Sequence, residues 1–127
     1  MPELPRPSDF ELAILRVLWR MGDATVRQVY EALQAERKLG YTTVLKTMQI
    51  MVDKGLLVRD ESARSHVYRA AEAPQATKGG LLKDLVDKAF GGSAIQLLAH
   101  ALNAKRPTKR ELDELQILLD HARKERK

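Results

Sequence analysis

The sequence contains no cysteine. This absence excludes a disulfide framework, a thiolate metal site and a cysteine nucleophile. Aromatic residues are few, at 5% of the chain, which argues against a module that stacks RNA bases on aromatic side chains. No stretch approaches the ~20 apolar residues of a membrane span, and the N-terminus lacks the pattern of a secretory signal. We therefore expect a cytoplasmic protein with no segment inserted in a membrane.

Residues that could support catalysis or metal binding are also sparse. The histidines His66, His100 and His121 are scattered, and no two are four residues apart as a helical metal site requires. The glycine pairs at 79–80 and 91–92 lack the flanking pattern of a phosphate-binding loop. We expect no metal, no cofactor and no catalytic site, so a small-molecule enzyme is the least favoured class.

Composition is that of a globular protein with a basic surplus. The 127 residues are 44% hydrophobic and 31% charged, which suits one domain, or a small domain with an accessory segment. The net charge of +5 favours a polyanionic partner. The surplus lies in residues 74–127, with 11 basic and 7 acidic side chains, against 11 and 10 in residues 1–73. The charge alone therefore does not locate a binding surface.

The first 55 residues contain signals for three helices. Ser8 with Glu11 and Thr25 with Gln28 have the spacing of capping boxes, and predict helices over about 9–21 and 26–38. Thr42 or Thr43 is expected to cap a third helix that ends at Gly55. Its buried side is predicted to consist of Val44, Met48, Met51 and Val52.

The hydrophobic period then changes from helical to alternating. Residues 56–60 and 66–69 read as two strands around the polar turn 61–65, which predicts a hairpin. Three helices followed by a hairpin form a winged helix-turn-helix, in which the third helix enters a DNA major groove and the hairpin follows the flanking backbone. We predict a mainly α fold with a small β hairpin, and a DNA-binding domain over residues 1–72.

The second part of the chain, residues 73–127, is rich in leucine. After a polar linker over Glu72–Thr77, helices are expected over about 81–90, from Ser93, and from a third capping box of Thr108 with Glu111. So small a segment cannot bury its apolar faces alone, and a second copy would cover them. We predict a helical dimerisation domain and a homodimer, with interface residues Leu81, Leu85, Leu98, Leu102, Leu112, Leu115, Leu118 and Leu119.

The predicted base-reading residues lie on the third helix, away from its buried side. They are Thr42, Thr43, Leu45, Lys46 and Gln49. Lysine can meet guanine acceptors, glutamine can read adenine, and threonine or leucine can touch a thymine methyl group. An ordinary solvated helix face is the alternative interpretation, and such faces are common.

Basic residues outside this helix are candidates for the DNA backbone. Arg27 lies in the first turn of the second helix, where a cation opposes the helix dipole, which hints at a phosphate ligand. We expect Arg27, Lys54 and Arg64 to contact phosphates. His66, beside the hairpin tip, could reach the backbone or the minor groove, although any soluble protein places charge at a loop tip.

Several short motifs occur together between Phe10 and Arg69. They are Val17-Leu18-Trp19, Gly22-Asp23-Ala24-Thr25-Val26, Val29-Tyr30-Glu31-Ala32-Leu33, Tyr41-Thr42-Thr43-Val44, Lys54-Gly55-Leu56-Leu57 and Tyr68-Arg69. In this combination the stretch resembles the penicillinase-repressor family of the BlaI/MecI type. A weaker resemblance continues through Glu111-Leu112-Asp113-Glu114-Leu115 and Leu118-Leu119, so the whole length fits the plan of that family.

The resemblance implies a homodimeric repressor that binds a palindromic operator in double-stranded DNA. In this family repression is relieved when a membrane sensor metalloprotease triggers cleavage, and β-lactam resistance is one known output. The cut falls at an Asn-Phe bond, and the matching positions here are His100-Ala101, which departs from the family pattern. Copper-responsive relatives carry a C-terminal cysteine motif, which this chain lacks. The inducing signal stays open between another protease site, a ligand between helices, and no regulation of that type.

The main alternative is a winged-helix module that binds a protein partner. The near-neutral first part of the chain would allow this, through the face of the third helix or the leucine-rich segment. Salt-insensitive association with a protein partner would favour the alternative, whereas DNA binding should weaken steeply with salt.

Overall fold

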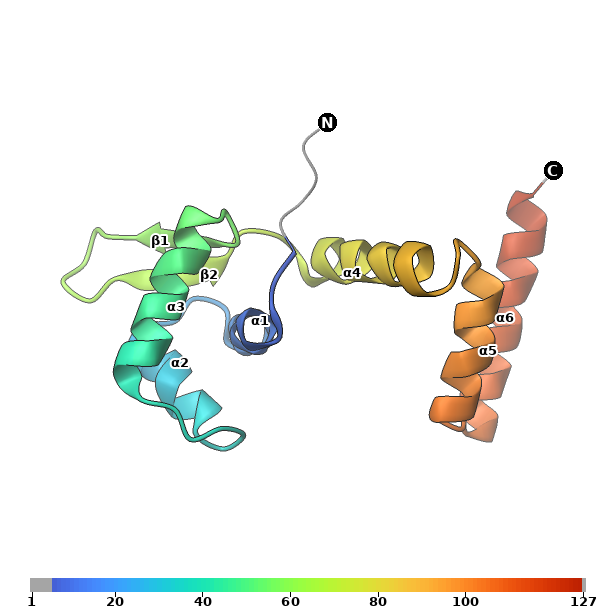
Figure 1. Ribbon diagram of the computed structural model, residues 1–127, viewed down its shortest axis with the longest axis horizontal. Helices are drawn as coiled ribbons and strands as arrows, with labels where there is room; N and C mark the ends of the chain where they lie inside the picture. The colour runs from blue at the N-terminus through green and yellow to red at the C-terminus, as the bar shows by residue number, and fades with distance from the viewer. Residues whose placement is uncertain (1–5, 127) are drawn as a thin grey trace. The chain divides into compact units, whose positions relative to one another are not determined.

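The computed structural model describes residues 6–126 and contains two compact units, one ending at Leu82 and the other beginning at Lys83 (Figure 1). The elements of the first unit are α1 (Asp9–Met21), α2 (Val26–Leu33), α3 (Tyr41–Asp53), β1 (Leu57–Asp60) and β2 (Val67–Ala70). Then follow α4 (Pro74–Ala89), which begins in the first unit and continues into the second, α5 (Ala94–Ala104) and α6 (Lys109–Glu125). The predicted fold class, mainly helical with one hairpin, is confirmed.

Local capping signals account for where three of the helices begin. The side chain of Ser8 accepts a hydrogen bond from the Glu11 amide, and the Glu11 carboxylate accepts one from the Ser8 amide. The same reciprocal pattern starts α2 and α6. These helices begin where the sequence predicts, because a capping box needs only residues three positions apart.

The core of the first unit lies between the three helices and the hairpin. Its fully buried side chains come from all three helices, with Ile14 and Leu18 on α1, Leu33 on α2 and Met48 on α3. Val44 and Met51 are buried as predicted, whereas Val52 is only partly buried. The buried side of α3 therefore packs against the core, and its other side is left for solvent or a ligand.

Backbone hydrogen bonds attach the hairpin to the helices. β1 and β2 pair antiparallel, from Leu57 opposite Ala70 to Asp60 opposite Val67. Ala24, just before α2, exchanges two hydrogen bonds with Tyr68, at 3.0 and 2.8 Å. This contact holds β2 next to the N-terminus of α2.

Two helix ends differ from the prediction. α2 ends at Leu33 rather than near Lys38, because the Leu33 carbonyl accepts hydrogen bonds from the amides of both Glu36 and Arg37 in a tight turn. α3 begins at Tyr41 with Gly40 as its N-cap, and no side chain among the described residues caps it. The predicted caps Thr42 and Thr43 are wrong, because both residues lie inside the first turn of the helix.

The linker predicted over Glu72–Thr77 is mostly helical. α4 begins at Pro74, a residue whose fixed φ suits the first position of a helix. Thr77 is buried, and the Trp19 Nε1 donates a hydrogen bond to the Glu72 carbonyl at 3.2 Å. The compact units divide inside α4, whereas a domain boundary after residue 72 stays a prediction from the sequence.

The second unit exposes its apolar side chains. Gly91 and Gly92, both at positive φ, separate α4 from α5, and Ser93 caps α5. From Lys83 to Arg126 no side chain is buried in the single chain. The exposed large apolar residues of this unit are Leu85, Ile95, Leu98, Leu102, Leu112, Ile117, Leu118 and Leu119. Over residues 6–126, no helix has the length and apolar character needed to span a membrane.

One ion pair joins α1 to the end of α3. The Lys54 Nζ donates to both carboxylate oxygens of Glu11, at 2.8 and 2.9 Å, and Glu11 is only 5% exposed. Burial by itself raises the pKa of Glu11, but the hydrogen bonds from Lys54 and Ser8 outweigh it. The pKa therefore lies below its ordinary value of 4.5.

We predict that Glu11→Gln lowers the free energy of unfolding by about 1–2 kcal/mol at neutral pH, because the ion pair is lost while the glutamine can still cap α1. The wild-type contribution is complete above pH 4.5 and is lost as the pH falls through the lowered pKa of Glu11. Urea unfolding at several pH values measures both effects. As a control, Glu36→Gln breaks the exposed pair with Arg16, at 3.8 Å, and should cost less than about 0.5 kcal/mol. Equal pH dependence in wild type and Glu11→Gln would contradict the prediction.

Candidate nucleic-acid interface

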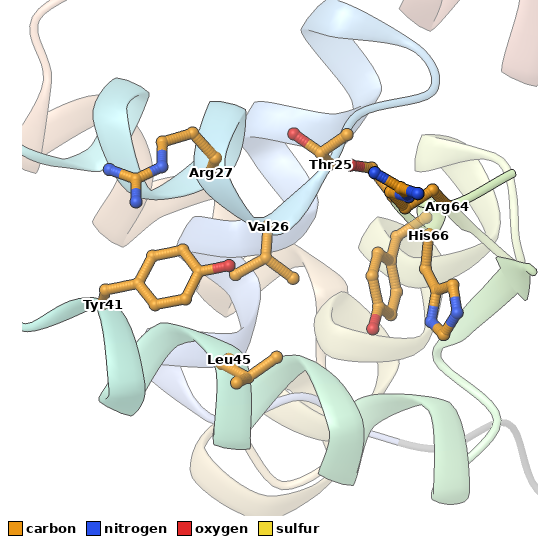
Figure 2. A pocket seen from close by; sticks show the side chains of 9 residues that line it. Thr25, Val26, Arg27, Tyr41, Leu45, Arg64 and His66 are labelled. Atoms are coloured by element: carbon orange, nitrogen blue, oxygen red, sulfur yellow. The ribbon is translucent and has the colours of Figure 1, made fainter.

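Three segments far apart in the sequence line one groove of about 310 Å³. The groove lies between the start of α2, the first turns of α3 and the hairpin loop (Figure 2). Its lining residues are Thr25, Val26, Arg27, Tyr41, Leu45, Arg64, Ser65, His66 and Tyr68. The Ala24–Tyr68 backbone contact explains why the hairpin forms one wall, since it holds β2 beside α2.

The outward side of α3 carries the predicted base-reading residues. Thr42, Thr43, Lys46 and Gln49 are exposed, and Leu45 is half-buried where it lines the groove. Val44 and Met48 face the core from the same helix, so the two sides of α3 are chemically distinct. An exposed helix face with hydroxyl, ammonium and amide groups has the donors and acceptors that can meet base edges.

Arg27 lies against two tyrosine rings. Its Cζ is 4.9 Å from the centroid of the Tyr41 ring and 5.8 Å from that of Tyr30. The two rings meet edge to face, with centroids 5.6 Å apart and an interplanar angle of 76°. No carboxylate among residues 6–126 forms an ion pair with Arg27. The cation is therefore held by aromatic contacts and keeps its hydrogen-bond donors.

The hairpin loop places Arg64 on the opposite wall of the groove. The Asp60 carboxylate accepts a hydrogen bond from the Ser62 amide at 2.9 Å; this bond shapes the turn and lowers the pKa of Asp60. Glu61 lies 3.5 Å from the Arg59 Nε and 3.9 Å from the His66 Nε2. Arg64 has no such acidic neighbour among the ion pairs of the described chain, so its charge is available to a ligand.

Lys54 lies apart from the other predicted contacts. It follows the last turn of α3, whereas the groove involves the first turns, and its ammonium group is bound to Glu11. Contact of Lys54 with DNA therefore stays a prediction, while its contact with Glu11 is what the structure shows.

Sequence reasoning did not select Thr25, Tyr30, Tyr41 or Ser65. The spacing of Arg27 and Tyr30, three positions apart on α2, was a local signal for part of this site. Tyr41 could not be placed in this way, because its approach to Arg27 depends on the turn between α2 and α3.

The second unit contains an apolar groove of about 340 Å³ between α5 and α6. Leu102, Leu115 and Leu118 line it, and the charged residues Lys105, Arg106, Glu111 and Glu114 also contribute to its walls. Of the predicted interface residues, six are exposed in the single chain: Leu85, Leu98, Leu102, Leu112, Leu118 and Leu119. The other two, Leu81 and Leu115, are half-buried. An apolar surface of this kind is typical of a segment that pairs with another chain.

Comparisons with known proteins identify a family and several similar chains. The family model described as penicillinase repressor matches residues 7–121. The transcriptional regulator BlaI of Mycobacterium tuberculosis, in strains CDC 1551 and H37Rv, is 37% identical over 102 residues, which cover 79% of this chain and 74% of that protein.

Two solved structures share the fold. One is the monomeric form of Bacillus licheniformis BlaI in complex with the blaP half-operator, and the other is the DNA-binding domain of the repressor BlaI. Each matches with a TM-score of 0.52 and 22% identity, and each match covers 60% of this chain and 93% of the solved chain.

Proposed function

The chain belongs to the penicillinase repressor family, and we propose that it acts as a transcriptional repressor that binds operator DNA. The family is one of transcriptional regulators and not of enzymes. The observation that carries the proposal is the position of the exposed side of α3 next to a groove that contains Arg27 and Arg64. We infer that α3 enters the major groove and that the hairpin follows the flanking backbone.

The residues divide into those that read bases and those that set position. We assign base contacts to Thr42, Thr43, Leu45, Lys46 and Gln49, on the outward side of α3. Arg27 and Arg64, from the two walls of the groove, contact phosphates, which fix the register of a protein on DNA without reading sequence. We assign His66, which lines the hairpin side of the groove, to contact with the DNA backbone or the minor groove.

We propose that the repressor is a homodimer on a palindromic operator. The exposed leucines of α5 and α6 support this, because a second copy would remove them from water. Two copies related by a two-fold axis would present two α3 helices about one DNA turn, ~34 Å, apart. A repressor works where the DNA is, and we therefore place the protein in the cytoplasm.

Release from DNA through a sensor-metalloprotease pathway is a proposal from the family plan. His100 and Ala101, which stand where that plan has its Asn-Phe bond, are exposed on α5. A protease acting there would have to accept a different residue pair.

The test is fluorescence-anisotropy binding to DNA from upstream of the protein's own gene and to scrambled DNA, at two salt concentrations. Tight, sequence-preferring binding whose log affinity falls by about 0.9 per neutralised phosphate against log salt would support the repressor. Equal, weak and salt-insensitive binding to both duplexes would favour the alternative, a module that binds a protein partner.

Lys46→Ala and Arg64→Ala should separate base reading from positioning. We expect Lys46→Ala to cost about 1–3 kcal/mol on the operator and to reduce its preference over scrambled DNA. Arg64→Ala should weaken both duplexes alike and lower the salt slope by about 0.9. The reading face would be misplaced if Lys46→Ala left both affinity and preference unchanged.

A further inference from the structure

The contact between Arg27 and Tyr41 joins two helices across a turn. Arg27 belongs to the first turn of α2, and Tyr41 is the first residue of α3. Figure 2 shows the Arg27 side chain above the Tyr41 ring at one end of the groove, with Arg64 and His66 on the other side. Tyr30, one turn along α2 from Arg27, provides the second ring.

The two rings restrict the guanidinium group without using its hydrogen bonds. An aromatic face attracts a cation through the ring quadrupole, and the N–H donors of arginine lie around the edge of its planar head group. A carboxylate partner would accept from those donors and compete with any anion. Because Arg27 has ring contacts and no ion pair within residues 6–126, its donors remain available for two parallel hydrogen bonds to a phosphate.

Holding the Arg27 side chain in place before binding should increase the affinity for a phosphate. An arginine that is mobile in the unbound protein loses rotamer freedom when it binds, and this loss reduces affinity. Tyr41 is 37% exposed, so it does not form part of the hydrophobic core. Its ring therefore contributes chiefly to the surface that surrounds Arg27.

We propose that Tyr41 is a positioning residue that holds Arg27, with Tyr30 as the second ring, ready to bind a backbone phosphate of duplex DNA. The inference rests on the proposed function and extends it. The first helix of a helix-turn-helix crosses the DNA backbone, which makes a phosphate, rather than a base, the partner of Arg27. Arg64, on the opposite wall of the groove, provides a second cation for the DNA backbone.

The effects of substitutions at Arg27 and Tyr41 on binding should not depend on the DNA sequence. We expect Arg27→Ala to weaken binding to operator and scrambled DNA equally and to lower the salt slope by about 0.9. Tyr41→Leu, which removes the ring but keeps an apolar side chain, should weaken binding to both duplexes about three- to fivefold, within the range of the entropy lost when one long side chain is immobilised. Tyr41→Phe keeps the ring face and should bind as the wild type does.

The experiment is a double-mutant cycle on the full chain. Anisotropy titrations with the upstream duplex and with scrambled duplex compare wild type, Arg27→Ala, Tyr41→Leu and the double variant, and urea unfolding confirms that each variant folds. If Tyr41 acts through Arg27, Tyr41→Leu has no further effect once Arg27 is alanine. In an Arg64→Ala background, the matched control, Tyr41→Leu should retain its full effect.

Two results would overturn the inference while leaving the repressor function in place. One is an equal loss from Tyr41→Leu whether or not Arg27 is present. The other is a loss in Tyr41→Phe as large as that in Tyr41→Leu, which would show that the hydroxyl binds DNA itself. A wild-type protein that bound neither duplex would remove the proposed function and this inference together.

Discussion

Replacing Met48 by alanine should lower the free energy of unfolding by about 3 kcal/mol, because it leaves a cavity in a fully buried part of the core. Met48 is 0% exposed and attaches α3 to the other helices of the first unit. The loss is a large share of the roughly 5–15 kcal/mol by which domains are stable. Urea unfolding measures it.

Gln49→Ala is the matched control, because Gln49 is the exposed neighbour of Met48 on the same helix. It should change stability by less than about 0.5 kcal/mol while reducing base preference. The two variants thus separate the buried and the outward sides of α3. A Met48→Ala protein as stable as the wild type would contradict the prediction, because it would show that neighbouring side chains fill the cavity.

If the chain forms the proposed dimer, replacing Leu118 by lysine should convert it into a monomer and weaken operator binding by about 100-fold or more. Leu118 lines the apolar groove between α5 and α6 and is 65% exposed in the single chain. The substitution should therefore destabilise an interface between two chains more than the fold of one chain. The affinity for the operator falls because a monomer binds only one half-site, whereas a dimer binds both half-sites at once. Sedimentation equilibrium should change from twice the chain mass to the 14.3 kDa of one chain.

Asp113→Lys provides the control for this experiment, since it introduces a lysine on a different side of α6, outside the groove. We expect it to leave the dimer intact. A Leu118→Lys protein that sedimented as a dimer and bound the operator normally would place the interface elsewhere.

Features that depend on neighbours in the sequence were predictable. The capping boxes at Ser8, Thr25 and Thr108 mark the starts of three helices correctly, because their hydrogen bonds span three residues. The alternation in residues 56–60 and 66–69 likewise indicated the hairpin, whose strands are residues 57–60 and 67–70. The exposed side of α3 followed from the position of its buried residues one helical turn apart.

The end of α2 shows where local reasoning failed. Residues 34–38 are compatible with a helix by their propensities, so the sequence predicted a longer element. In the structure the chain turns at Leu33, the Gln34 side chain donates to the Leu39 carbonyl at 3.1 Å, and Leu39 packs against the core. Packing of Leu39 against the core favours the turn over a longer helix, and this contribution exists only once the core has formed.

By itself, the sequence determined the helices and hairpin of the first unit, the starts of the three helices with capping boxes, the side of α3 that faces outward and the resemblance to a repressor family. These depend on periodicity and on hydrogen bonds over three or four residues. Only the tertiary structure decided that Lys54 binds Glu11 across 43 positions, that Ala24 holds the hairpin beside α2, and that Tyr41 lies against Arg27. Such contacts follow from how the helices pack around one core. Packing brings together residues that are far apart in the sequence, and no local pattern in the sequence indicates that they are neighbours.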